Sequence, residues 1–330
     1  MNQFDIPVAI FMFKRKDTLL RIIEAVSTVK PQKLYLISDE GRNEKEKAEV
    51  ADVRKAAEEA VNWNCNIVKY YAKENRGVYN NIAGGAKWVF SHEDKAIFLE
   101  DDNLPEITFF DYCKEMLNIY KDDERILWVC GTNYLSEFKN KNDDSYFFTQ
   151  HLLPCGWASW SWKFNKFYDG EMANYGNPLY MDAFKASYKS KVLLNQRLRS
   201  LEGEYRRGKE STGFRSWDYQ MLFSIRSNNL YGISPKYNQI RNIGADQFSS
   251  HGGTNLNMVM TRRFCEIPTK PLEFPLRHPT EVKIDNEYES KVANIVLLPL
   301  SLRIKGNAIR IIKRMLGIDP YMSIKTVLHK

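Results

Sequence analysis

The chain has 330 residues, of which 43% are hydrophobic and 27% charged, a composition that supports a large buried core and excludes a disordered protein. The net charge of +7 is unevenly placed, because residues 295–330 hold seven basic side chains and one acidic one. The rest of the chain is nearly neutral, which argues against a nucleic-acid-binding protein.

Five apolar runs of strand length alternate with helix-like segments up to residue 131. Strands are expected at 6–13, 33–39, 65–71, 95–100 and 125–131, and helices after a cap at Asp17 and at 43–61, 78–90 and 106–120. Such alternation predicts the α/β class, with a mostly parallel sheet flanked by helices. In sheets of this kind, ligands bind beyond the carboxyl ends of the strands.

The pattern is less regular after residue 131. A helix is expected over 179–201, and three prolines in 270–295 predict a linker before the basic tail. The tryptophans of "GWASWSWKF" (156–164) suit core packing at least as well as a sugar-stacking platform, and we expect two of the three in the core.

The cysteines and apolar runs bear on the compartment. The five cysteines are odd in number and form no C-x-x-C pair, which suits a reducing cytoplasm better than a disulfide framework. The run at 6–13 is short and follows Asp5, so it is typical of a strand rather than of a leader peptide. No apolar run approaches the roughly 20 residues that span a bilayer. We therefore expect a cytoplasmic protein.

Glu100, Asp101 and Asp102, here called the acidic triplet, directly follow a buried-strand pattern. Clustered carboxylates are suitable ligands for Mg²⁺ or Mn²⁺. Neighbouring side chains of a strand point to opposite faces, so the three cannot all be ligands if the extended conformation persists. From these residues alone, an acidic strand-to-helix connection that caps the next helix is an equally good interpretation.

The segment "AIFLEDDNLPEITFFDYCKEML" resembles GT-A-type glycosyltransferases, specifically the N-acetylglucosaminyltransferase I family, in which Glu-Asp-Asp is a form of the metal-binding D-x-D motif. The likeness covers roughly residues 5–255 and is strongest at 95–115 and 214–222. It implies a GT-A fold, Rossmann-like and mostly parallel, with a C-terminal acceptor-side region. The implied division is a nucleotide-sugar-binding half at 1–130, an acceptor-side catalytic half at 131–270, and a linker with a basic helical tail at 271–330.

The resemblance also implies roles for single residues of the acidic triplet and of other segments. Asp102 is implied as the direct ligand of Mn²⁺ or Mg²⁺, with Glu100 in support and Asp101 on the ribose or a metal-bound water. The other implied nucleotide-binding residues are Arg15, Asp39 (on the uracil), Arg76, and Ser249, Ser250 and His251 of a loop that closes over the diphosphate. Arg76 departs from the family, which carries a His in that region.

"RSWDYQMLFSIR" resembles the family's Trp-Asp stretch and implies that Asp218 is the catalytic base. The alternative is that Asp218 caps the helix expected at 219–225. One carboxylate suffices as base, because a diphosphate leaves without protonation.

The implied activity is metal-dependent transfer of a sugar, with inversion, from a UDP-sugar to a hydroxyl of a glycan or lipid-linked acceptor in surface-polysaccharide synthesis. One alternative is a sugar-phosphate nucleotidyltransferase, although no Gly-rich phosphate loop follows the first strand. The other is a non-catalytic nucleotide-sugar or glycan-binding module, which has no need of a base at Asp218.

Residues 300–317 have the pattern of a basic amphipathic helix. Such a helix can lie in an anionic membrane surface, which would place the protein at the inner face of the cytoplasmic membrane. It can equally pack its apolar stripe on the domain or on a partner. The sequence leaves both interpretations open.

Overall fold

The computed structural model describes residues 3–210, 213–245, 255–319 and 321. An eight-stranded sheet is formed by β1 (Val8–Met12), β2 (Lys33–Ser38), β3 (Asn66–Tyr71), β4 (Lys95–Glu100), β6 (Ile126–Cys130), β7 (Tyr146–Thr149), β8 (Trp157–Trp160) and β9 (Tyr231–Pro235). Its order is β3-β2-β1-β4-β8-β6-β9-β7. The pairs among β1 to β4 and the pair β6–β9 are parallel, whereas β8 and β7 run antiparallel to their neighbours. The expected fold class, α/β with a mostly parallel sheet, is confirmed.

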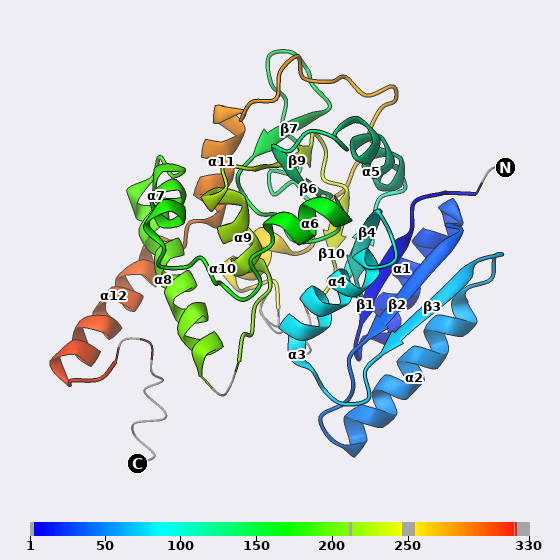
Figure 1. The fold of residues 1–330 in the computed structure, drawn as a ribbon, viewed down its shortest axis with the longest axis horizontal. Coiled ribbons are helices and arrows are strands. Elements are labelled where there is room, and N and C mark those ends of the chain that lie inside the picture. Colours follow the sequence, from blue (N-terminus) through cyan, green and yellow to red (C-terminus); the bar gives the residue numbers. More distant parts are fainter. Residues whose placement is uncertain (1–2, 211–212, 246–254, 320, 322–330) are drawn as a thin grey trace.

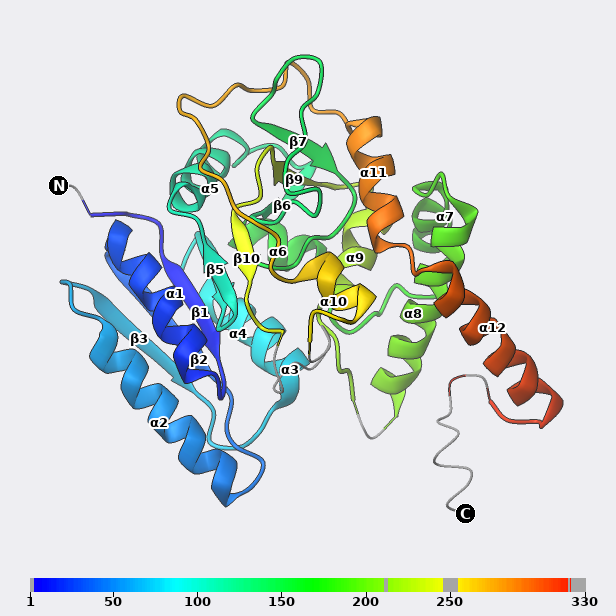
Figure 2. The same cartoon turned by 180° about the vertical axis from the view of Figure 1, so that it is seen from behind.

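Helices cover both faces of this sheet (Figures 1 and 2). In chain order they are α1 (Lys16–Val29), α2 (Glu44–Ala60), α3 (Gly77–Tyr79), the π-helical turn η1 (Asn80–Gly84), α4 (Gly85–Phe90), α5 (Thr108–Ile119), α6 (Ser161–Phe167), α7 (Pro178–Ala186), α8 (Lys191–Lys209), α9 (Asp218–Ser227), α10 (Val259–Phe264), α11 (Asn286–Val296) and α12 (Leu300–Met315). None of the described helices is long and apolar enough to cross a bilayer.

Strand β1 shows why the strands were recognisable as apolar runs. Val8, Ile10 and Met12 pack on the face that α1, α2 and α5 cover, whereas Ala9 and Phe11 pack on the face that α4, α6 and α9 cover. All five residues are buried because helices lie on both sides. A parallel strand covered on both faces therefore reads as a continuous apolar segment.

A short ribbon beside the main sheet was not expected. The strands β5 (Asn103–Pro105) and β10 (Ile240–Asn242) pair antiparallel, with Asn103 opposite Asn242. Three-residue strands leave too short a pattern to be read from sequence. The ribbon matters because it joins the segment after the acidic triplet to a part of the chain about 140 residues away.

Two expected helix boundaries are wrong. The helix expected after Asp17 begins at Lys16, and Arg15 stands at its N-cap without a side-chain hydrogen bond, so Asp17 lies within the first turn. The helix expected over 179–201 is two helices, α7 and α8, and the hydroxyl of Ser190 caps the second by accepting from the backbone N–H of Leu193.

The linker expected at 270–295 is also corrected. From Asn286 the chain forms α11, in which Tyr288 and Val292 are fully buried. The Tyr288 hydroxyl lies 2.6 Å from the hydroxyl of Ser234, so the helix is part of the core next to β9. The tryptophan prediction, in contrast, is confirmed, since Trp157 and Trp160 are buried and Trp162 is exposed.

Candidate active site

A cleft of about 860 Å³ opens at the carboxyl ends of β1, β2 and β4. Further lining residues come from α8, α9 and α10, from the end of β10 and from the segment 296–298. The cleft therefore lies where ligands bind in sheets of this kind. All three residues of the acidic triplet line the cleft, and so do the predicted site residues Arg15, Asp39 and Asp218.

The acidic triplet enters this cleft because β4 ends at its first residue. Glu100 still pairs with Phe11 of β1, and the chain then turns through Asp101 and Asp102. The Oδ2 of Asp101 accepts a hydrogen bond of 2.9 Å from the backbone N–H of Phe13. This bond ties the turn to the end of β1. All three carboxyl groups consequently reach one cleft, which the alternation of a strand would not allow.

Arg15 is the cation beside the triplet. Its Nη1 donates to Oδ2 of Asp102 over 2.5 Å and lies 3.5 Å from Oδ1 of Asp101. Its Nη2 donates to the carbonyl oxygen of Gly244 over 3.3 Å. A Cβ on Gly244 would lie 2.2 Å from Oδ2 of Asp102, so this close approach requires glycine.

The cleft carries more negative charge than Arg15 offsets. Burial, and then the carboxylates of Asp102, Asp101 and Asp218, raise the pKa of Glu100 well above its usual range. Burial and the neighbouring Asp102 raise the pKa of Asp101 to about 7, although Arg15 opposes the shift. The described residues give the Glu100 carboxyl group no hydrogen bond or ion pair. A further cation at this point would be stabilised by all four acids.

The donor atoms suit a hard divalent cation such as Mn²⁺ or Mg²⁺, because they are carboxylate oxygens. Among the residues that the structure describes, however, no group of three or more His, Cys, Asp or Glu side chains is arranged to hold a metal by itself. Such ions commonly use one or two carboxylates and complete their shell with phosphate and water oxygens. The triplet fits a cation of that kind and does not form a closed protein site.

Asp218 comes to the cleft from the first turn of α9. The hydroxyl of Ser216 donates to Oδ1 of Asp218 and accepts a hydrogen bond of 3.1 Å from the backbone N–H of Tyr219. Ser216, and not Asp218, therefore caps the start of α9. Capping was the alternative role that the sequence allowed for Asp218. In the described part of the chain, Asp218 accepts no hydrogen bond from the helix backbone, so its carboxylate stays available for chemistry.

An aromatic layer supports this helix end. Trp217 is buried, and its ring centroid lies 5.9 Å from those of Trp128 and Trp157. Because large, closely packed rings leave few alternative positions, the backbone before Asp218 is held in place.

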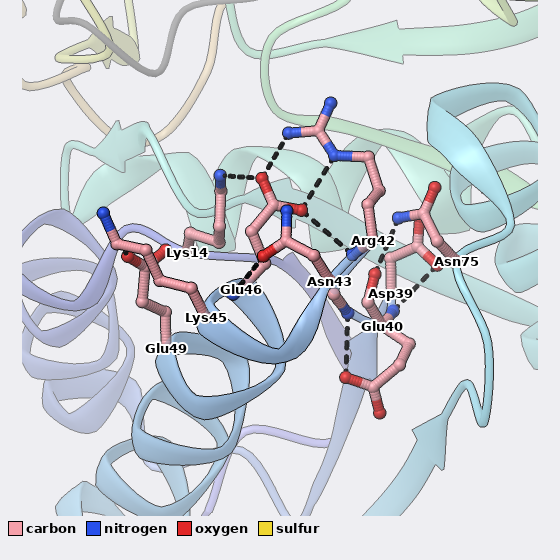
Figure 3. Close-up of polar contacts among 10 residues, drawn as sticks. Lys14, Asp39, Glu40, Arg42, Asn43, Lys45, Glu46, Glu49 and Asn75 are labelled. Atoms are coloured by element: carbon pink, nitrogen blue, oxygen red, sulfur yellow. Dashed lines mark hydrogen bonds and ion pairs between the residues drawn. The ribbon is translucent and has the colours of Figure 1, made fainter.

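Asp39 follows β2 and organises the neighbouring segment (Figure 3). Its Oδ1 accepts from the backbone N–H groups of Glu40 at 2.9 Å and Arg76 at 2.7 Å. Its Oδ2 accepts from the N–H of Gly77 at 2.9 Å and from the side chain of Asn75 at 3.1 Å. The carboxylate thus holds Asn75 and Gly77 at the cleft wall, and its contact with a base stays a prediction.

A second group of charges lies at the same end of the cleft (Figure 3). Lys14 and Arg42 both line the cleft and both donate to Glu46, at the start of α2. Arg42 and Lys14 hold the pKa of that carboxyl group well below its usual range. The two cations are thereby oriented at the cleft wall.

Of the remaining predicted residues, Arg76 is not brought to the cleft. The guanidinium of Arg76 lies over the ring of Tyr70, 4.5 Å from its centroid, and donates to Asn81 over 2.8 Å. Arg76 is not among the lining residues. Ser249, Ser250 and His251 lie outside the described residues. Their roles stay predictions.

Arg197 is a lining residue that sequence reasoning missed. It lies on α8, and within the described ranges no hydrogen bond or ion pair involves its guanidinium. Its charge and that of Asp218 both act on the hydroxyl of Tyr134, whose pKa burial raises far above the usual range. No local signal distinguishes Arg197 from Arg199, Arg206 and Arg207 of the same helix.

No protein-family model matches the sequence, and the search of curated proteins gives no match. The chain is similar to solved structures of mouse xyloside xylosyltransferase 1 (10% identity, 68% of this chain and 83% of that chain, TM-score 0.35) and of UDP-glucose pyrophosphorylase complexed with UDP-glucose (9%, 72% and 94%, 0.33). HddC from Yersinia pseudotuberculosis is 17% identical over 37% of this chain at a TM-score of 0.26, and the overlap spans 57% of HddC. These overlaps assign no activity to the chain.

Proposed function

We propose that the chain is a glycosyltransferase of the GT-A type that uses a nucleotide-diphosphate sugar, a UDP-sugar, as donor. One observation carries the proposal: the cleft brings the acidic triplet with Arg15 together with Asp218, a carboxylate that comes from a separate helix and is not used as a cap. A transferase needs both parts, acidic residues that can hold a cation for the leaving diphosphate and a base for the acceptor hydroxyl.

The donor end is formed by residues after β1, β2 and β4. Arg15 and Lys14 supply positive charge for the phosphates, and Asp39 orients the segment that borders the nucleoside. Asp102, with Glu100, would hold the divalent cation. When bound there, Mn²⁺ or Mg²⁺ neutralises charge on the leaving diphosphate as a Lewis acid.

Asp218 is the proposed base. It accepts the proton of the acceptor hydroxyl while the acceptor oxygen forms a bond to the anomeric carbon and the bond from that carbon to the diphosphate oxygen breaks. The nucleoside diphosphate leaves with the bonding electron pair. Attack opposite the leaving group inverts the anomeric centre. General-base assistance of this kind is typically worth about 10²–10⁴-fold in rate.

The connection between β1 and α1 favours this activity over nucleotidyl transfer. It consists of Phe13, Lys14 and Arg15 and contains no glycine. A loop of three residues with side chains is too short and too crowded to wrap a triphosphate through its backbone N–H groups. We further propose a glycan or lipid-linked acceptor and a role in surface-polysaccharide synthesis, at the cytoplasmic side of the membrane.

The test is a panel of UDP-sugars assayed for UDP release with Mn²⁺, Mg²⁺ or EDTA. Asp218→Asn should retain UDP binding by calorimetry and lose at least about 100-fold in turnover, because the base is removed while the donor site is kept. Asp182→Asn, on the exposed face of α7, is the matched control and should behave as wild type. Unchanged turnover in Asp218→Asn, or release of pyrophosphate instead of UDP, would contradict the proposal.

A further inference from the structure

Helix α12 turns its polar face to the protein and its apolar face outward. The partly or fully buried residues of α12 are Arg303, Gly306, Ile309, Arg310 and Lys313, which lie on one side of the helix, and Ile309 is the one large apolar residue among them. Figures 1 and 2 show α12 extending away from the body next to α8. A helix that packs on its own domain normally has the opposite orientation.

The outward face is apolar and strongly exposed. It is formed by Leu300, Ile304, Ile311 and Met315, which are 61%, 59%, 60% and 72% exposed. Ile312 and Leu316 extend it at its edge. Contiguous apolar side chains along four turns form a surface that a monomer in water seldom leaves uncovered. The interpretation in which this stripe packs on the domain is therefore not supported by the described residues.

A polar contact joins α12 to α8. The Nη1 of Arg199 on α8 donates to Oδ1 of Asn307 over 3.3 Å. Burial and the nearby Arg199 lower the pKa of Arg310. Like charges at this contact oppose close packing. The helix is thus held to α8 by polar contacts, while its hydrophobic stripe makes no part of that attachment.

The charge of α12 indicates which kind of partner covers the apolar stripe. The helix carries Arg303, Lys305, Arg310, Lys313 and Arg314 and no acidic residue. Lys305 and Arg314 are exposed and flank the stripe on opposite sides. Two copies that paired through this surface would bring like charges together. An anionic surface with an apolar interior offers a match for both the stripe and its flanks.

The helix begins at the rim of the cleft. Val296 and Leu298 line the cleft, and α12 starts two residues later. Gln196, the neighbour of Arg197, donates to the carbonyl of Val296 over 3.0 Å and accepts from the N–H of Leu298 over 2.9 Å. A partner that binds the apolar face of α12 would therefore lie close to the opening of the cleft.

We propose that the outward face of α12 docks on an anionic phospholipid bilayer. The stripe enters the headgroup region, and the flanking basic residues contact lipid phosphates. The cleft then opens next to the bilayer, so an acceptor carried by a lipid reaches it without leaving the membrane. Docking itself goes beyond the proposed transferase activity and is measured without donor or acceptor.

The experiment is flotation of the full chain with vesicles of phosphatidylcholine alone or mixed with phosphatidylglycerol. Wild type should float with the anionic vesicles, and the triple variant Ile304→Ser, Ile311→Ser, Met315→Ser should lose at least about tenfold in partitioning. Lys305→Gln and Arg314→Gln should each weaken it about fivefold at low salt. Leu179→Ser on α7, where the side chain is 74% exposed, is the matched control and should float as wild type.

Equal flotation of the triple variant and wild type, failure of wild type to float, or equal binding to neutral vesicles would each overturn the proposal. Sedimentation velocity over a range of concentrations adds a second arm. A dimer that the triple variant dissociates, without vesicle binding by wild type, would assign the stripe to a second copy and overturn the proposal as well. Because the substituted side chains are exposed, thermal unfolding should match wild type and exclude misfolding.

Discussion

The Nη1 of Arg15 lies 2.5 Å from Oδ2 of Asp102, and this contact joins the end of β1 to the turn after β4. Both side chains are largely buried, so the pair is shielded from water. A divalent cation bound by Asp102 would compete with Arg15 for the same oxygen. The positive charge of Arg15 and that of the proposed metal would therefore act on the same carboxylate.

Arg15→Gln should make the protein more dependent on a divalent cation. Removing the guanidinium leaves the triplet less compensated, and we expect a loss of about 3 kcal/mol in the free energy of unfolding. Mn²⁺ should raise the melting temperature of the variant more than that of wild type. Thermal unfolding with and without Mn²⁺ checks this.

The control for that experiment is Arg54→Gln. Arg54 forms a similarly buried ion pair with Glu40, at 3.1 Å, but does not line the cleft. It should lose stability without gaining a response to Mn²⁺. If Mn²⁺ stabilises neither Arg15→Gln nor wild type, the proposed ligand role of Asp102 is wrong.

Gly244→Ala should damage activity more than stability. The new Cβ would lie within 3 Å of three atoms of Asp102, so the carboxylate has to shift. A misplacement of this size in a reacting centre can cost about 100-fold in rate. Gly84→Ala, where a Cβ meets nothing within 4 Å, should keep full activity. Turnover of the two variants, compared at equal folded concentration, provides the measurement, and equal rates would contradict the expectation.

Arg197→Gln should weaken the binding of an anionic group of the substrate. Arg197 lines the cleft, and the described residues offer its guanidinium no hydrogen-bonding partner, so a bound anion would supply one. A charge-assisted hydrogen bond is worth about 1.5–3 kcal/mol, which corresponds to a loss of roughly 10- to 100-fold. Arg199→Gln, on the side of α8 that meets α12, is the control.

Two measurements on Arg197→Gln locate the anion. Weaker UDP binding by calorimetry assigns Arg197 to the donor diphosphate. Slower turnover with normal UDP binding assigns it to the acceptor or to charge that develops during transfer. No change in either measurement would remove Arg197 from the site.

Stability should fall between pH 6.5 and pH 4 because of His151. Burial lowers the pKa of His151 to about 4, although Glu289 opposes the shift. In this range the imidazole is protonated in the unfolded chain and neutral in the folded protein. The free energy of unfolding therefore falls by up to about 3 kcal/mol as the pH drops. His151→Gln keeps a donor for the carbonyl of Glu289, which His151 contacts at 3.0 Å.

The His151→Gln variant should consequently show a flatter dependence of unfolding free energy on pH across that range. Denaturant titrations at pH 7, 5.5 and 4.5 measure the slope for both proteins. Parallel profiles would show that His151 does not titrate in this range, and that other groups cause any acid destabilisation.

The strands and the acidic triplet could be predicted for different physical reasons. Strands β1, β2 and β4 are buried between helices on both faces, so their sequences are continuous apolar runs. The triplet stood out because three adjacent carboxylates directly follow such a run. Helix α11 was missed, since the prolines before it resemble a linker and its burial depends on the distant Ser234.

The sequence by itself determined the strands β1 to β4 and β6 with the helices between them, the position of the acids at the end of β4, and the basic, amphipathic character of residues 300–317. These are properties of neighbours along the chain, where periodicity and adjacency carry the signal. Only the tertiary structure decided that Ser216 caps α9 in place of Asp218, that Arg197 lines the cleft, and that α12 turns its apolar face outward. The first is a choice between adjacent hydrogen-bond acceptors, and the others depend on how segments far apart in the chain pack, which no local pattern specifies.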